Sequence, residues 1–273
     1  SIYYKIGDDG IWKPWDCTTT SLSNNKKMYL ERFDRSNGIT RDKYTDYCTF
    51  KMTGSIAASG DITSLIYYRH SLDLLYGCFA NLFKDCSSLT QAPELPATTL
   101  SSDCYYSMFE GCTSLTTAPA LPATTVEYYC YNHMFKNCTS LVQAPELPAT
   151  TLAEFCYSYM FESCTSLVHA PELPATTLAT YCYAGMFQYC ASLITAPALP
   201  ATTLKQDCYN GMFWGCTSLT TAPELPATEL VINCYTYMFY SCSNLNYVKA
   251  LFTNIADYAL DNWLNSVSPT GTF

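Results

Sequence analysis

The chain has few basic residues and no long apolar run. Its 14 lysines and arginines are outnumbered by 23 aspartates and glutamates, which gives a formal net charge of -9 and a pI near 4.7. A nucleic-acid partner needs a basic surface to match its phosphates, so this composition argues against nucleic acid and against an anionic membrane. No stretch approaches the roughly 20 apolar residues that span a bilayer. We therefore expect no direct membrane insertion.

The sequence also lacks the residues and motifs of common catalytic sites. It has only three histidines, and no Gly-rich phosphate loop, G-x-S-x-G elbow or H-E-x-x-H motif. His133 and His169 lie 36 residues apart and are expected on different walls of the molecule. We interpret each histidine as a surface residue, and we expect no enzymatic activity and no cofactor.

Sixteen cysteines are present, and fourteen of them follow a period of 26 residues. One series contains Cys78, Cys104, Cys130, Cys156, Cys182, Cys208 and Cys234, and the other contains Cys86, Cys112, Cys138, Cys164, Cys190, Cys216 and Cys242. One unit reads L-x3-C-[YF]-x2-[ML]-F-x2-C-x2-L-x2-A-P-x-L-P-A-T-[TE]. Repetition at a fixed period of this length predicts a solenoid.

The cysteine columns are predicted to be buried free thiols that pack as small hydrophobic side chains. Stacked units place equivalent residues about 5 Å apart, but side chains in such a ladder point the same way, which disfavours a disulfide. The spacing C-x7-C also lacks the close pairing of zinc sites, so no metal is expected. Cys17 and Cys48 lie outside the columns, and either a bridge or two free thiols fits them.

Each unit is predicted to contain a short helix and an extended limb. In the unit that begins at Leu100, apolar residues recur every four positions, which is typical of the buried stripe of a helix. Two prolines per unit then favour an extended limb. The predicted fold is an α/β solenoid, a leucine-rich-repeat-like right-handed array of 26-residue strand-plus-short-helix units. Its predicted repeat core is Cys104, Met108, Phe109, Cys112, Leu115 and Leu121.

Three regions are predicted along the chain. Residues 1–60 are a small N-terminal β unit that caps the array, with strands expected at 2–6, 11–15, 28–33 and 47–56. Residues 61–252 form the solenoid, and residues 253–273 form a C-terminal helical cap. In the last unit, Val248 and Leu251 are expected at the positions of Ala222 and Leu225. A closing helix is expected over 255–267, because a terminal unit must cover its apolar face.

The repeat resembles the leucine-rich repeats of the BspA type, found on surface and secreted proteins of host-associated bacteria such as gut anaerobes. The residues that carry the resemblance are Phe109, Cys112, Leu115, Ala118, Leu121 and Pro122, with their copies at 26-residue spacing. The resemblance covers about two thirds of the chain. It implies an exported protein, extracellular or on the cell surface, that binds something, with adhesion as the commonest role. The chain itself shows no signal or anchor, and we expect it to be a mature or trimmed form.

Tyrosines are abundant, and those at variable positions are the candidate binding surface. One regular column follows the first cysteine series, and we expect it to stack with its hydroxyls at the surface. The irregular aromatic residues suit a protein or glycan partner, since amphipathic rings are enriched at interfaces. These candidates are Tyr106, Tyr128, Tyr129, Tyr159, Tyr181, Tyr189, Trp214, Tyr237 and Tyr240.

Two further columns offer weaker candidates. Carboxylates recur at Glu94, Glu146, Glu172 and Glu224, and we interpret them as a solvated edge, because one carboxylate per unit is too few for a calcium site. A competing surface consists of Gln91, Thr117, Gln143, His169, Thr195 and Thr221.

The leading hypothesis is a non-enzymatic, cell-surface or secreted binding or adhesion module that presents one solenoid face to a host or microbial protein or glycan. The alternative is a structural spacer or stalk of a larger surface protein. A third hypothesis, a glycan- or peptide-processing enzyme, requires a pocket that a regular array does not supply.

Overall fold

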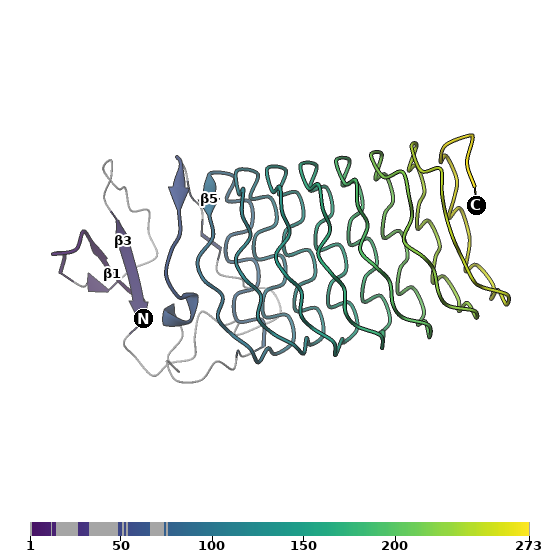
Figure 1. Ribbon diagram of the computed structural model, residues 1–273. Helices are drawn as coiled ribbons and strands as arrows, with labels where there is room; N and C mark the ends of the chain where they lie inside the picture. Colours follow the sequence, from purple (N-terminus) through teal and green to yellow (C-terminus); the bar gives the residue numbers. More distant parts are fainter. Residues whose placement is uncertain are drawn as a thin grey trace.

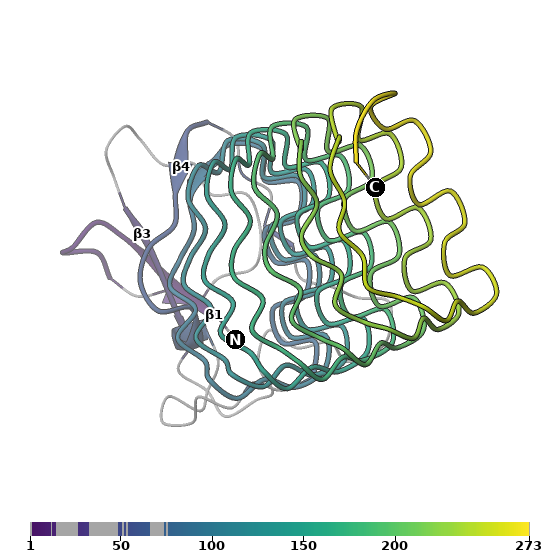
Figure 2. The ribbon, with the colours of Figure 1, turned by 45° about the vertical axis from the view of Figure 1, so that its right-hand side comes forward.

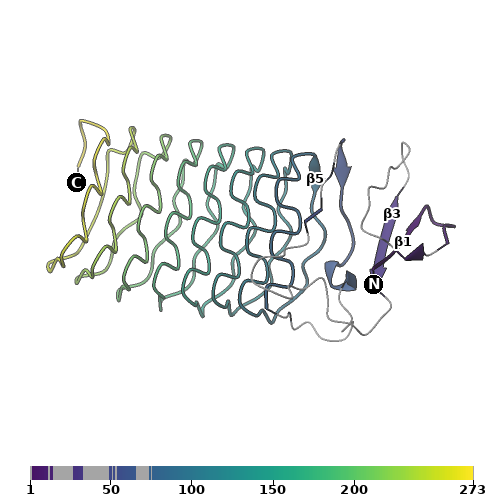
Figure 3. The ribbon, with the colours of Figure 1, turned by 180° about the vertical axis from the view of Figure 1, so that it is seen from behind.

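The computed structural model is one elongated stack of coils that runs from the N-terminal sheet to the C-terminal coil (Figure 1). It describes residues 2–11, 13–14, 27–32, 49–50, 52, 54–65, 74 and 76–272. The view turned by 45° shows that each coil follows a wave-like path (Figure 2). The view from behind shows the same regular stack (Figure 3). The repeats therefore form a solenoid, as the period predicts.

One wall of the solenoid, which we call the turn wall, consists of successive tight turns. It comprises residues 76–85, 102–111, 128–137, 154–163, 180–189, 206–215, 232–241 and 257–266. In one coil, the N–H of Met108 donates to the carbonyl of Tyr105 at 3.1 Å, which closes a turn. The N–H of Tyr105 donates instead to the carbonyl of Cys130 on the next coil, also at 3.1 Å. The N–H groups along the turn wall thus alternate: one closes a turn within its own coil, and the next bonds a carbonyl of the following coil.

Every fourth residue of the turn wall has a positive φ, which defines three left-handed rows. The first row is Gly77, Asp103, Tyr129, Phe155, Tyr181, Asp207 and Asn233. The second row is Asn81, Ser107, His133, Tyr159, Gly185, Gly211 and Tyr237. The third row is Asp85, Gly111, Asn137, Ser163, Tyr189, Gly215 and Ser241. Each left-handed residue and the residue before it form an outer pair, and the two residues between outer pairs form an inner pair. Some members of outer pairs, such as Ser107 and Ser158, are nevertheless buried.

The short helix predicted in each unit is wrong, because no α-helix occurs among the described residues. Apolar residues do recur every four positions, at Leu100, Cys104, Met108 and Cys112. This period arises because the tight turns themselves repeat every four residues, and each turn directs one inner pair into the core. A helix turns once in 3.6 residues, so it could not keep two adjacent residues, such as Met108 and Phe109, inside at every fourth step. The turns also release half of the N–H groups to bond the next coil.

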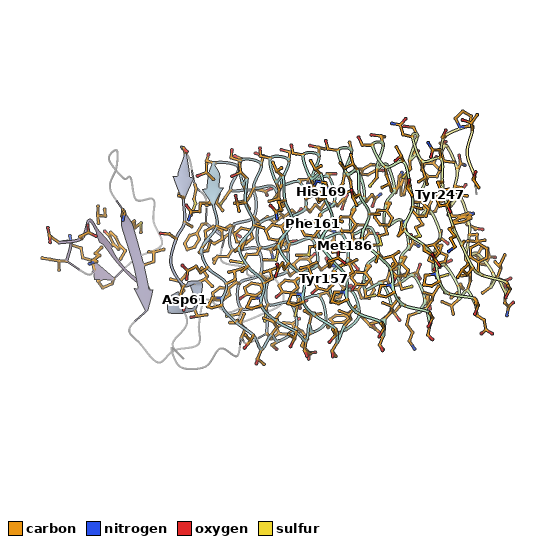
Figure 4. The ribbon with its side chains drawn as sticks, viewed as in Figure 1. Asp61, Tyr157, Phe161, His169, Met186 and Tyr247 are labelled. Atoms are coloured by element: carbon orange, nitrogen blue, oxygen red, sulfur yellow. The ribbon has the colours of Figure 1, made fainter. Side chains whose placement is uncertain are left out.

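The inner pairs fill a continuous core between the two walls. All six residues of the predicted repeat core are buried, with Leu121 the most exposed at 3%. The phenylalanine rings stack along the solenoid, with a centroid distance of 5.6 Å between Phe109 and Phe135. Figure 4 shows Tyr157, Phe161 and Met186 among the side chains of this stack. Because equivalent residues stack on one another, each coil contributes to the core of both neighbours.

The regular tyrosine column stacks as predicted, but its hydroxyls are not at the surface. The rings of Tyr105 and Tyr131 lie parallel with centroids 5.8 Å apart, and each residue is only 1% exposed. Both hydroxyls are buried and have no hydrogen-bond partner. The correction has a simple cause, because each tyrosine is the second member of an inner pair and its whole side chain lies inside. An unsatisfied buried hydroxyl costs about 1–3 kcal/mol.

The fourteen column cysteines are buried and form no disulfide in the described part of the chain, whereas Cys17 and Cys48 lie outside the described residues. In the second series each thiol donates to a carbonyl of the preceding coil. The Sγ of Cys112 lies 3.1 Å from the carbonyl oxygen of Phe83, which also accepts the N–H of Cys86. The thiols therefore supply a weak second donor to a buried carbonyl as well as apolar volume.

The opposite wall, which we call the extended wall, follows the prolines. Single parallel bridges link neighbouring coils there, for example Thr117 with Gln143 and Thr125 with Thr151. Among the described residues, regular strands occur at this wall only where β5 (Leu89–Gln91) pairs in parallel with β4 (Ile56–Ala57). Proline removes the donors that a longer ladder needs, so the wall remains a series of isolated bridges.

The N-terminal strands form a three-stranded antiparallel sheet in the order β2, β1, β3. Its strands are β1 (Ile2–Ile6), β2 (Lys13–Pro14) and β3 (Met28–Arg32), at three of the predicted places. A 3-10 helix, η1 (Ile62–Leu65), follows and packs against β3. Much of the fourth predicted strand, 47–56, lies outside the described residues, and only Ile56 of its described part belongs to a strand.

At the C-terminal end, the predicted closing helix is also wrong. Residues 257–266 form another series of tight turns in the turn wall, with positive φ at Tyr258, Asn262 and Ser266. The last unit is one residue shorter than the others, because Leu225 bridges Ala250 instead of the residue 26 positions on. Leu251 is consequently 42% exposed and does not take the position of Leu225, although Val248 is buried as expected.

The left-handed rows predict how side-chain type affects stability. Gly211 has a φ of 60°, and Asn81 occupies the same row with a φ of 58°. A left-handed conformation costs most for a β-branched residue and little for Asn. We expect Gly211→Val to reduce the free energy of unfolding by about 1–2 kcal/mol more than Gly211→Asn, as measured by denaturant titration. Equal losses in the two variants would contradict the assignment of this conformation.

The buried thiols predict a difference between native and denatured protein. Burial raises the pKa of the Cys86 thiol to about 11 and that of Cys242 to about 12, and the thiolate is the reactive form. We expect the column thiols to resist a disulfide reagent at pH 8 in the native protein and all fourteen to react after denaturation. Fewer than about ten reactive thiols in the denatured, unreduced protein would rule out free columns.

Candidate functional site

All nine aromatic residues selected from the sequence lie in outer pairs of the turn wall. Tyr129, Tyr159, Tyr181, Tyr189 and Tyr237 occupy left-handed positions. The other four, Tyr106, Tyr128, Trp214 and Tyr240, directly precede left-handed residues. The same backbone that places Cys–Tyr and Met–Phe pairs inside therefore places these variable residues outside. Their rings group into two clusters.

The first aromatic cluster contains two stacks of rings. Phe155 lies between Tyr129 and Tyr181, with centroid distances of 4.8 Å and 4.6 Å and nearly parallel planes. His133 and Tyr159 form the second stack, 5.1 Å apart. Additional edge contacts complete the cluster and join its stacks: Tyr128 with Tyr129 and Phe155, and Tyr106 with Tyr129 and His133. The cluster spans several coils, and Tyr128 is 42% exposed.

The second aromatic cluster is centred on Trp214. Its ring stacks on Tyr237 at 5.3 Å with an interplanar angle of 17°. Tyr240 meets Trp214 edge-on at 5.1 Å, and Tyr189 lies tilted at 5.8 Å. These contacts fix the orientation of all four rings in the free protein. Aromatic pairs of this kind contribute roughly 0.5–1.5 kcal/mol each beyond their buried area.

Sequence reasoning missed Phe155 and His133 as members of the first cluster. Phe155 follows Tyr129 at the 26-residue period and precedes Tyr181 by the same period, so the period alone was a sufficient signal. His133 was interpreted as a surface residue on the basis of its variable position. In the structure it is partly buried between Tyr106 and Tyr159, and its Nδ1 lies against Oδ1 of Asn132.

Glycines on the next coil make room for the outer rings. A Cβ atom at Gly185 would lie 2.2 Å from the ring of Tyr159, and one at Gly215 would lie 2.6 Å from the ring of Tyr189. Real Cβ atoms do not approach so closely, so each tyrosine requires a glycine at that place. The ring on one coil therefore occupies the place that a side chain would take on the next coil.

A buried carboxylate lies beside the clusters. Asp207 is 1% exposed and accepts hydrogen bonds from Nδ2 of Asn210 at 2.8 Å and of Asn233 at 3.5 Å. Burial, and then a hydrogen bond to this carboxylate, raises the pKa of Tyr181 to about 12. The carboxylate therefore interacts with side chains on its own coil and on both neighbours.

Charged residues near the first cluster are paired with each other. Nζ of Lys84 lies 2.8 Å from Oε2 of Glu110, and Lys136 and Glu162 form the same contact at 2.8 Å. Burial opposes ionisation of Glu110, but the hydrogen bonds from Lys84 and Ser107 outweigh it, and the pKa of Glu110 is lowered. Each pair therefore neutralises one of the carboxylates in this part of the turn wall.

The two weaker candidate columns lie on the extended wall. Thr117, Gln143, His169 and Thr195 bridge one another in series and are exposed, and His169 is labelled in Figure 4. In the carboxylate column, Glu224 pairs with Lys249 at 2.8 Å. Within the part of the chain that the structure describes, no three His, Cys, Asp or Glu side chains gather as metal ligands. Neither column therefore collects several functional groups at one point.

Comparison with known families identifies the repeat. The sequence model described as the BspA type leucine rich repeat region matches six copies, over residues 80–194 and 131–267. No curated protein and no solved structure matches the chain. Across the described ranges, no helix has the length and apolar character needed to cross a membrane.

The position of His133 between rings predicts an unusual titration. Burial lowers the pKa of His133 from its ordinary 6.5 to about 4, and the nearby positive charge of Lys136 adds to this effect. The folded protein therefore favours neutral His133, and the stability this contributes above pH 6.5 is lost as the pH falls through about 4. We expect one histidine Cε1–H signal in the NMR spectrum to titrate near pH 4 and to be missing in His133→Ser. A midpoint near 6.5 for that signal would contradict the stacked position.

Proposed function

Because the chain belongs to the BspA-type leucine-rich repeat family, we propose that it is a non-enzymatic binding module that presents its turn wall to a protein or glycan partner. Repeats of this family are commonly surface-associated protein-interaction modules. We propose the same setting here, secreted or on the cell surface, with a host or microbial surface molecule as the partner. Both the family and the arrangement of aromatic residues support this function.

The observation that carries the proposal is the concentration of variable aromatic residues on one wall. Tyr128 and Tyr189 are each 42% exposed, and the partly exposed rings around them belong to the two clusters. Aromatic side chains are the residues that most often dominate binding energy, because they offer large contact areas with few rotatable bonds. Stacking against neighbours lowers the entropy that these rings lose when a partner binds.

The regular core supports a rigid presentation of this wall. Hydrogen bonds between the turns of neighbouring coils recur along the solenoid. For example, the N–H of Phe109 donates to the carbonyl of Met134, and the N–H of Phe135 donates to the carbonyl of Met160, each at 2.9 Å. The same rigidity would suit a spacer that holds another domain away from the cell. In a spacer, however, the variable aromatic residues would have no role, and their replacement would be silent.

The solenoid supplies its own substitutions for the test, since each outer residue can be replaced by its equivalent from another coil. We expect the combined variant Tyr159→Gly, Tyr181→Asn, Trp214→Gln and Tyr237→Gly to lose binding in a screen against arrayed glycans and extracellular proteins. The expected loss for any ligand of the wild-type chain is at least about a hundredfold in Kd, because several anchoring rings are removed.

The matched control is Tyr247→Thr. Tyr247 is an aromatic residue with 42% exposure on the extended wall, and Thr221 occupies the preceding bridge position. Binding should survive this change. If the wild-type chain binds a ligand and the turn-wall variant binds equally well, the turn wall is not the binding face. If no ligand is found and both variants are silent, the spacer function is favoured.

A further inference from the structure

The first aromatic cluster is flanked by exposed carboxylates. Glu127 directly precedes Tyr128, and Glu154 forms an outer pair with Phe155; both glutamates are exposed. Tyr128 is itself 42% exposed, which makes it the most exposed ring of this cluster. Across the described ranges, neither Glu127 nor Glu154 has an ion-pair partner, in contrast to the two glutamates of this wall that bind lysines. Two free negative charges therefore lie next to exposed aromatic surface.

Backbone hydrogen bonds place a third carboxylate and the same rings on consecutive coils. The N–H of Asp103 donates to the carbonyl of Tyr128 at 2.9 Å, and the N–H of Tyr129 donates to the carbonyl of Glu154 at 3.3 Å. Asp103 also directly precedes Tyr129 in the first left-handed row. Burial raises the pKa of Tyr129 to about 12, and the neighbouring tyrosines and the charge of Asp103 add to this shift. The carboxylates and the ring stack thus form one surface.

The negative charge is local to the first aromatic cluster. The positions equivalent to both glutamates on the following coils carry no carboxylate: they are Ala153, Ala179 and Lys205 in one column and Thr180 and Gln206 in the other. The turn wall is therefore acidic beside the first cluster and loses these charges toward the second. A partner that is selected by charge would distinguish the two clusters.

We propose that the first aromatic cluster, together with the carboxylates of Asp103, Glu127 and Glu154, is the docking surface for an arginine-bearing segment of a partner protein. The guanidinium group is planar and cationic, so it stacks on aromatic rings, and its fork of N–H groups matches a carboxylate. Lysine carries the same charge without the plane or the fork. The net charge of -9 also favours encounter with a basic partner. This inference rests on the proposed function and narrows it to one class of partner.

The test measures binding of the full chain to a synthetic peptide of repeated Arg-Gly-Gly units by fluorescence anisotropy. Matched peptides carry lysine or glutamate in place of arginine. We expect saturable binding of the arginine peptide, at least about tenfold weaker binding of the lysine peptide, and no binding of the glutamate peptide. Added salt should weaken the binding of the arginine peptide, because exposed charges are screened.

Two variants separate the roles of charge and ring, and both use residues from other coils. The double variant Glu127→Ala and Glu154→Thr introduces the residues found at positions 153 and 180. It should weaken binding of the arginine peptide at least about tenfold, since two carboxylate partners are lost. Tyr128→Thr leaves the charge unchanged and should weaken binding about three- to fivefold, the size of an exposed cation–π contact.

The matched control removes two negative charges from the extended wall instead. Glu146→Ala and Glu172→Ala together introduce the residue found at positions 120 and 198. This variant should bind the arginine peptide as the wild-type chain does, and thermal unfolding should establish that all the variants fold. A general attraction between an acidic protein and a basic peptide would instead weaken equally in both double variants.

Three results would overturn the docking surface: no binding of the arginine peptide, equal binding of the lysine peptide, or equal effects of the two double variants. An unchanged affinity in Tyr128→Thr would do the same. If a glycan or a protein from the wider screen requires the turn-wall rings while the arginine peptide does not bind, this inference fails and the proposed function stands. If no ligand depends on the turn wall, both fail.

Discussion

The hydrogen bonds that join the turns of one coil to the turns of the next are the interaction on which the rest of this structure depends. In each coil, alternate N–H groups leave the local turn and bond a carbonyl of the following coil, as Ser107 does with Asn132 at 2.9 Å. The alternation requires a left-handed residue at every fourth position. That conformation costs roughly 1–2 kcal/mol for an ordinary L-residue, and each coil pays it to gain bonds to its neighbour.

The alternation of inner and outer pairs also explains the composition of the core. Each turn directs two adjacent residues inward, so cysteine is followed by tyrosine or phenylalanine, and methionine or leucine by phenylalanine. Identical side chains then stack at the coil spacing, and the thiol of Cys138 reaches a carbonyl of the preceding coil at 3.1 Å. Small polarizable groups suit this interior because they fill the space between stacked rings and walls without requiring strong polar partners.

The outer pairs carry whatever distinguishes one coil from another. Because inner positions are fixed by stacking, variation collects at the left-handed rows and at the residues before them. Here that variation takes the form of aromatic rings, two of which, Tyr159 and Tyr189, depend on a glycine in the next coil for space. Tyr159 and Gly185 illustrate the coupling, since a side chain at one excludes a side chain at the other. A binding surface on this fold is therefore built by pairs of coils and not by single residues.

The sequence by itself determined the solenoid, the membership of the buried columns and the set of variable aromatic residues, because a strict 26-residue period identifies equivalent positions without any coordinates. It did not determine the local backbone. The recurrence of Leu100, Cys104 and Met108 fits a helix and a series of turns equally well. The signal for turns was the frequency of glycine, asparagine and aspartate in the three left-handed rows, where they occupy 11 of the 21 positions. Whether the hydroxyl of Tyr105 reaches water, and which outer rings meet, depended on contacts between coils. Only the tertiary structure decided these features, because the hydrogen bonds and ring stacks responsible join residues about one repeat apart, and no local propensity encodes them.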